Sequence, residues 1–216
     1  MKFRFSKRKR FACFAMGLAL CGLGVAMSTR PGLGTSPISS FPYVMTFIAP
    51  LTLGQWTIII NVLMVLAQIA ILRKEFQWFQ LSQMIASVLL GTFIDAGMWL
   101  TAFFIPQNYL LCMAEQLLGC AVLACGITME LIAEVTYMPG EGLVKTISEY
   151  WRLNFGKVKI CFDLSLVVIA LAVSLSFCGE INGIREGTLV AAFAVGLLVK
   201  SYLKPFRSLK RLLVKA

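Results

Sequence analysis

Four polar side chains interrupt long apolar runs of the sequence and are its best candidates for chemistry. Asp95, Glu115 and Asp163 carry carboxylates, and Asn61 carries an amide. An ionisable group is costly to hold in an apolar, membrane-like environment, so such a residue marks a functional site by default. We expect the four to surround a central cavity that binds a proton, a cation or a polar solute. The alternative is that each is hydrogen-bonded or neutralised and holds helices together.

The composition explains why these residues must lie on membrane helices. The chain has 216 residues, of which 59% are hydrophobic and only 14% charged, whereas about 25% of a soluble domain is charged. About 20 apolar residues span a bilayer as a helix. Six stretches meet this requirement, at residues 11–29, 54–72, 83–104, 110–130, 159–178 and 187–202. The sequence therefore predicts an all-α polytopic membrane protein.

The positive charges predict which way the spans run. If both chain ends are cytoplasmic, Arg30 and Arg185 lie outside and the other 18 of the 20 Lys and Arg lie inside, as the positive-inside rule requires. The net charge of +10 then comes from loops and tails beside the spans. This pattern is typical of contact with anionic lipid and does not indicate nucleic-acid binding. We expect Glu130 and Glu134, near the cytoplasmic end of the fourth span, to be solvated.

Several enzyme and metal sites are excluded by residue type. The chain has no histidine, which rules out Ser-His-Asp and HExxH sites. Its seven cysteines form no CxxC pair and are typical of small helix-packing residues. We therefore expect no enzyme activity, no metal centre and no cofactor.

The sequence repeats itself at an offset of 102 residues. The matches are Gly17 with Gly119, Gly24 with Gly126, Pro37 with Pro139, Gly54 with Gly156, and Asn61 with Asp163. After a six-residue shortening, Gly91-Thr92 matches Gly187-Thr188. The halves cover residues 11–105 and 110–203 of one membrane domain, between basic cytoplasmic tails at 1–10 and 204–216. Because each half has three spans, an odd number, the second half must be inverted.

Each half contains a broken connection after its first span. The first connection includes Gly34, Thr35, Ser36 and Pro37, and the second includes Pro139 and Glu141. The segments that follow, 37–50 and 139–151, are too short to cross a bilayer as straight helices. Each is either re-entrant, with an N-terminus able to hold an anionic group, or an amphipathic helix at the interface.

Two functions fit these features. We prefer a secondary transporter or permease for a small solute, with proton coupling as one option and with its site between the inverted repeats. In that case Arg185 and Glu186 form either an outer gate or a local ion pair. The alternative is a non-transporting scaffold or sensor subunit, whose partners would be lipid and other protein, including copies of itself as a homo-oligomer.

The chain resembles the bacterial YczE/YyaS/YitT-type integral membrane proteins over about residues 10–200. The motifs that carry the resemblance are Gly32-Leu33-Gly34-Thr35-Ser36-Pro37, Leu53-Gly54-Gln55-Trp56, Leu90-Gly91-Thr92-Phe93-Ile94-Asp95, Pro139-Gly140-Glu141-Gly142-Leu143 and Arg185-Glu186-Gly187-Thr188. The resemblance implies a multi-pass protein of the bacterial plasma membrane, with small-molecule export among the roles proposed for the family.

Overall fold

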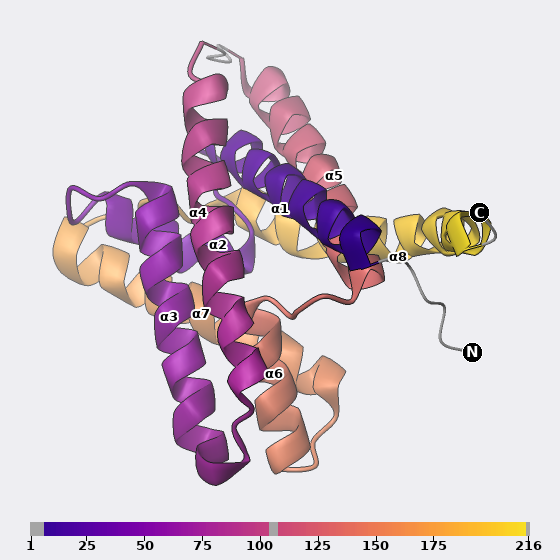
Figure 1. Ribbon diagram of the computed structural model, residues 1–216. Coiled ribbons are helices and arrows are strands. Elements are labelled where there is room, and N and C mark those ends of the chain that lie inside the picture. Colours follow the sequence, from indigo (N-terminus) through magenta and orange to yellow (C-terminus); the bar gives the residue numbers. More distant parts are fainter. Residues whose placement is uncertain (1–6, 104–107, 215–216) are drawn as a thin grey trace.

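The computed structural model describes residues 7–103 and 108–214, except the side chains of 7, 204 and 206–214. Its α-helices are α1 (Lys7–Thr29), α2 (Pro37–Thr46), α3 (Leu53–Leu72), α4 (Ser82–Leu100), α5 (Tyr109–Ala133), α6 (Pro139–Tyr150), α7 (Phe155–Cys178) and α8 (Glu186–Val214) (Figure 1). Two short 3-10 helices, η1 (Arg73–Glu75) and η2 (Trp78–Leu81), join α3 to α4. The predicted end of the third span at 104 and the outer ends of both basic tails lie outside the described residues.

Six helices of the described chain are long and apolar enough to cross a membrane, and they correspond to the six predicted spans. The other two, α2 and α6, have 10 and 12 residues. At a rise of 1.5 Å per residue they are about 15 and 18 Å long. Both are therefore half-length helices, which confirms that neither segment crosses a bilayer as a straight helix.

Local sequence fixes where these helices begin. Pro37 and Pro139 each occupy the first turn of a short helix, where the missing N–H costs nothing. The Thr52 hydroxyl accepts a hydrogen bond from the Gln55 N–H and completes a capping box at α3. At the equivalent start of α7, the Asn154 side chain accepts from the N–H groups of Gly156 and Lys157.

The centre of the bundle is a close contact between α1 and α5. A Cβ atom added at Gly24 would lie 2.4 Å from the Leu123 nitrogen, and one at Gly119 would lie 2.5 Å from the Ser28 nitrogen. Glycine at these positions lets the two backbones touch, as small residues do between membrane helices. Arg10 on α1 also donates to the carbonyl oxygen of Ala133 at 2.8 Å, and so satisfies the C-terminal end of α5.

The remaining helices are arranged around this central pair. Helix α4 packs against α1, and α8 packs against α5. The short helices cross between the halves, because α2 packs against α7 and α6 packs against α3. The order long, short, long, long occurs twice along the chain. The inverted relation of the two halves stays a prediction.

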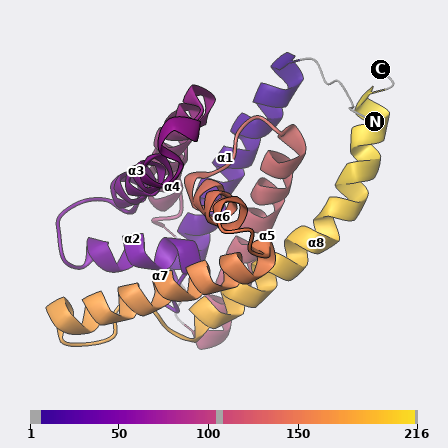
Figure 2. The same cartoon turned by 90° about the horizontal axis from the view of Figure 1, so that it is seen from below.

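One pair of contacts differs between the halves. Helices α3 and α4 are tightly packed, since a Cβ at Gly54 would lie only 2.0 Å from the Gly91 carbonyl oxygen. In the described residues, α7 and α8 make almost no contact with each other. The counterparts reflect this difference: Gly156 meets only its own cap, and Gly187 packs against Leu33 instead of α7. Figure 2 shows the C-terminal part of α8 diverging from the bundle.

Candidate functional site

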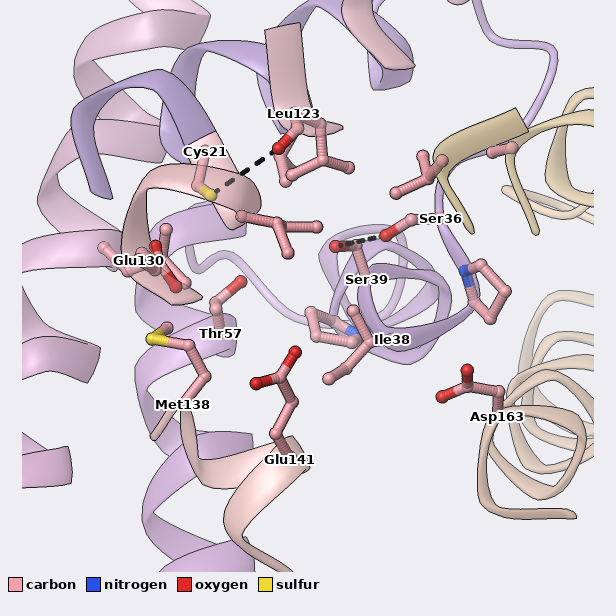
Figure 3. A pocket seen from close by; sticks show the side chains of 18 of the residues that line it. Cys21, Ser36, Ile38, Ser39, Thr57, Leu123, Glu130, Met138, Glu141 and Asp163 are labelled. Atoms are coloured by element: carbon pink, nitrogen blue, oxygen red, sulfur yellow. Dashed lines mark hydrogen bonds between the residues drawn. The ribbon is translucent and has the colours of Figure 1, made fainter. Parts of the chain in front are cut away.

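A cavity of about 400 Å³ lies between the two halves and is lined by residues of all eight α-helices described above. Its walls come from α1, α3, α4, α5, α7 and α8 and from the beginnings of the two short helices. Cavities of a few hundred cubic ångströms are the size at which small-molecule ligands bind. Figure 3 shows this space with side chains that line it, among them Ser36, Glu141 and Asp163.

The N-terminal ends of α2 and α6 meet at the cavity. A Cβ added at Gly140 would lie 2.3 Å from the Cδ1 atom of Ile38, so the two helix ends touch directly. Ser36 and Ser39 also line the cavity, and the Ser36 hydroxyl donates to that of Ser39 at 3.0 Å. Helix N-termini carry a partial positive charge. Two such ends therefore face one space.

Residues that are 102 apart in the chain line this cavity in pairs. The pairs are Cys21 with Leu123, Val25 with Ile127, Ser36 with Met138, Ile38 with Gly140, Ser39 with Glu141, Thr57 with Lys159, and Asn61 with Asp163. At three of these pairs the first half supplies a neutral polar residue and the second half a charged one. The two sides of the cavity are thus equivalent in position but different in charge.

The charged side contains an ion pair. The Lys159 ammonium lies 2.7 Å from Asp163 Oδ1, one helical turn along α7. Glu141, on α6, lies close enough to both groups for their charges to act on its carboxyl. Burial raises the pKa of the Glu141 carboxyl, the positive charge of Lys159 opposes this rise, and the negative charge of Asp163 adds to it. In Figure 3 the Glu141 carboxylate lies between Glu130 and Asp163.

Glu130 forms the opposite end of the polar lining. Only 8% of this residue is exposed, and its Oε1 atom has no hydrogen-bond partner among the described residues. The expectation that Glu130 is solvated is therefore wrong, because the turn of α5 that carries it faces the cavity. Glu134 lies beyond the end of α5 and is exposed, as expected.

The structure brings some of the predicted site residues together. Asn61 and Asp163 line the cavity from α3 and α7, and Ser36, Pro37 and Glu141 line it from the starts of the short helices. Pro139 is buried, and its carbonyl oxygen accepts a hydrogen bond from the Gln68 amide at 3.2 Å. Thr35 is also buried, and its hydroxyl accepts a hydrogen bond from the Thr29 hydroxyl at 3.0 Å.

Asp95 lies elsewhere. Its Oδ1 accepts from the Gly54 N–H at 2.8 Å and its Oδ2 from the Thr52 hydroxyl at 2.7 Å. The carboxylate therefore satisfies the start of α3 from α4 and does not line the cavity. Its prediction as a cavity residue fails because a free helix N-terminus lies within its reach and engages both of its oxygens.

The remaining candidates lie near the junction of α5 and α8. Glu115 is buried there on α5, also away from the cavity, and its Oε2 atom has no partner among the described residues. Gly34 has a φ of +109° and packs against Thr188. Arg185 and Glu186 form an exposed contact of 3.5 Å, which fits the local ion pair and leaves the gate untested.

Two charged residues of the cavity lining, Lys159 and Glu130, were not predicted from the sequence as site residues. Lys159 was predicted at the cytoplasmic end of the span 159–178, and Glu130 was predicted to be solvated. A signal was available for Lys159, since Thr57 matches it at the offset of 102. No comparable signal points to Glu130, because its counterpart, Ser28, is bonded within α1 and does not line the cavity.

Comparisons with known proteins place this bundle in a family. The model of the family of unknown function DUF6198 matches residues 8–204. The chain belongs to the DUF6198 family. Its match covers all six spans and both short helices, so the cavity is a feature of the part of the chain that defines membership.

Two Bacillus subtilis (strain 168) proteins are similar to this DUF6198 chain. One is named "Uncharacterized membrane protein YczE" and is 26% identical over 194 residues, which cover 88% of this chain and 84% of that protein. The other is named "Uncharacterized protein YyaS" and is 25% identical over 201 residues, covering 90% and 92%. No solved structure matches. The predicted YczE/YyaS-type resemblance is confirmed, and the chain is a multi-pass membrane protein.

Proposed function

We propose that the protein is a secondary transporter that moves a small solute through the central cavity, with proton movement coupled to that of the solute. The observation that carries this proposal is the set of seven residue pairs, each 102 apart, that line one cavity. Transporters built from inverted repeats bind their solutes between the repeats, beside broken helices. Here the broken helices α2 and α6 point their N-termini at the same space.

The difference between the α3–α4 and α7–α8 contacts supports alternating access. In a rocking mechanism, one half makes a contact while the equivalent contact of the other half is open. Gly54 and Gly91 bring α3 against α4, whereas Gly156 and Gly187 leave α7 and α8 apart. A scaffold protein has no such need for inequivalent halves.

We place both chain ends in the cytoplasm of a bacterial cell, with α2 and α6 re-entrant from opposite faces. The support is the charge count of the loops and the even number of spans. The buried residues of α6, which include Gly142, Val144 and Thr146, indicate a helix within the bundle and not on its surface.

A blocking variant tests the transport proposal. Gly196 lines the cavity, and an added Cβ there meets no described atom within 4 Å, so Gly196→Trp should fill the cavity without unfolding the bundle. Leu197→Trp is the matched control, because Leu197 is 68% exposed on the same helix. Purified protein is screened by thermal shift against amines, carboxylates, sugars and dyes, and each stabilising compound is then tested for flux in proteoliposomes.

The expected result is a compound that stabilises the wild type and the Leu197→Trp control, crosses the liposome membrane with them, and loses both effects in Gly196→Trp. If no compound stabilises the folded wild type, or if flux is unchanged by Gly196→Trp, the transporter proposal fails. The scaffold or sensor function then takes its place.

A further inference from the structure

We infer that the solute is an organic cation with an apolar body, and that its positive group lies between Glu130 and Glu141. This inference rests on the proposed transport function and specifies its substrate class. It draws on three features of the cavity: its apolar walls, its charge count and the position of Glu130.

Most of the cavity wall is hydrocarbon. The apolar lining includes Val25, Ile60, Leu90, Ile94, Ile127 and Val195. Such walls favour a ligand that removes its own apolar surface from water. They disfavour sugars and small inorganic ions, which would exchange hydration for contacts that offer no hydrogen bonds.

The charges of the cavity do not balance. Its ionisable lining consists of the carboxylates of Glu130, Glu141 and Asp163, the ammonium of Lys159 and the thiol of Cys21. The ion pair of Lys159 with Asp163 at 2.7 Å leaves two carboxylates without an equal positive charge. A buried uncompensated carboxylate is costly. Two protons, or a bound cation together with one proton, remove this cost.

The position of Glu130 selects a cation over an anion. It lies in the last turn of α5, at the negative end of the helix dipole. It is more than nine-tenths buried at the cavity, and its Oε1 has no donor in the described chain. The two helix N-termini could attract an anion, but Glu141 already occupies the start of α6, where a carboxylate offsets the dipole. A positive group satisfies Glu130 where an anion would repel it.

Proton coupling follows from the same groups. A cation and a proton compete for each carboxylate, so a cation that arrives displaces a proton. Glu130 faces Cys21 and Glu141, and Glu141 faces Lys159 and Asp163. Burial raises the pKa of Glu141, which makes this competition effective nearer to neutral pH.

Tetraphenylphosphonium and tetraphenylborate test the sign of the charge, because they have the same shape and opposite charges. Binding to the purified full chain is measured by calorimetry from about pH 8 to about pH 5. We expect the cation to bind more weakly as the pH falls and to release protons when it binds. Glu130→Gln and Glu141→Gln, which keep side-chain shape, should each weaken it about tenfold or more. Glu149→Gln is the matched control on α6. The Glu149 side chain is exposed, its ion pair with Lys145 at 3.9 Å lies on the surface, and it does not line the cavity.

Thermal unfolding of every variant confirms that it folds. If tetraphenylborate binds and Gly196→Trp abolishes this binding, the cavity takes an anion. The cation class is then overturned, whereas the transport proposal stands. Cation binding that neither glutamine variant weakens would overturn the assignment to Glu130 and Glu141. A series of arylammonium cations of different sizes is tested in the same way. If none of them binds, and tetraphenylphosphonium does not bind either, the organic-cation substrate class is overturned. In that case, a compound of another class that passes the flux test shows that the transport proposal survives.

Discussion

Asp95 shows how a carboxylate in an apolar helix can serve structure instead of transport. Both of its carboxylate oxygens accept hydrogen bonds from the start of α3. The carboxylate is therefore already engaged and is not available to bind a solute. Asn61 and Asp163 were predicted on the same ground as Asp95, but they are also equivalent across the repeat, and they do line the cavity. Asp95 has no carboxylate counterpart. Equivalence at the offset was thus a better guide to the cavity than polarity within a span.

Replacing Asp95 should lower stability and leave solute binding intact. Asp95→Ala removes the acceptor for Gly54 and Thr52 and should reduce the free energy of unfolding by about 1–2 kcal/mol. Asp95→Asn keeps one acceptor oxygen and should cost less. Unfolding in mixed detergent micelles measures both changes. Loss of ligand binding at unchanged stability would return Asp95 to the site.

Glu141 should make the protein less stable as the pH rises. Because burial raises its pKa above the usual 4.5, the folded chain holds this proton more tightly than the unfolded chain does. Below about pH 4.5 both states are protonated, and stability falls as the pH climbs from there through the raised value. Glu141→Gln should make this decline shallower and raise stability at neutral pH, while the buried carboxylate of Glu130 remains.

Unfolding measured between about pH 4 and pH 8 tests this prediction. Glu149→Gln should leave the decline in place, because that carboxylate is exposed. A Glu141→Gln variant that declines as steeply as the wild type would show that another group is responsible.

At the scale of helices, equivalent glycines of the two halves differ in how tightly they are packed. Gly54→Ala would place a methyl group 2.0 Å from the Gly91 carbonyl oxygen. The overpacking should cost about 1–3 kcal/mol and force α3 away from α4. The counterpart Gly156→Ala meets only Asn154 Oδ1, at 3.3 Å, and should be neutral or slightly stabilising. Equal thermal shifts in the two variants would contradict the asymmetry.

The sequence was sufficient to locate the short helices but not their meeting point. Pro37 and Pro139 stand at matching offsets with too few apolar residues after them, so their helices were predicted from length and proline chemistry alone. Contact between Ile38 and Gly140 depends on how the halves pack in three dimensions. No local pattern encodes that packing, and the choice between re-entrant and interfacial helices stayed open for this reason.

For the whole molecule, the predicted topology can be tested by cysteine labelling. After the seven native cysteines are replaced, Gln77→Cys and Ile181→Cys place one thiol in an exposed connection at either end of the bundle. A membrane-impermeant maleimide applied to intact cells should label Cys at 181 and reach 77 only after permeabilisation, because the positive-inside rule puts residue 77 in the cytoplasm. The reverse pattern would invert the proposed orientation.

The number of spans and their helical nature were predicted from composition, because about 20 apolar residues suffice to identify a membrane helix. The separation of α7 from α8 was not predictable. Gly54 and Gly91 have the equivalents Gly156 and Gly187, at offsets of 102 and 96 residues. A sequence that repeats in this way gives no reason to expect close contact in one pair of helices and separation in the other. That difference arises from how the helices pack in three dimensions.

If the protein is the proposed transporter, the separation of α7 and α8 also bears on where the solute would come from. Both helices line the cavity, yet they do not seal it against one another, and their outward side chains are apolar. In that case, an amphiphilic cation dissolved in the membrane would have a path to the site sideways from the lipid. The transport rate would then follow the mole fraction of cation in the bilayer, so adding lipid at a fixed total amount of cation would slow transport by dilution.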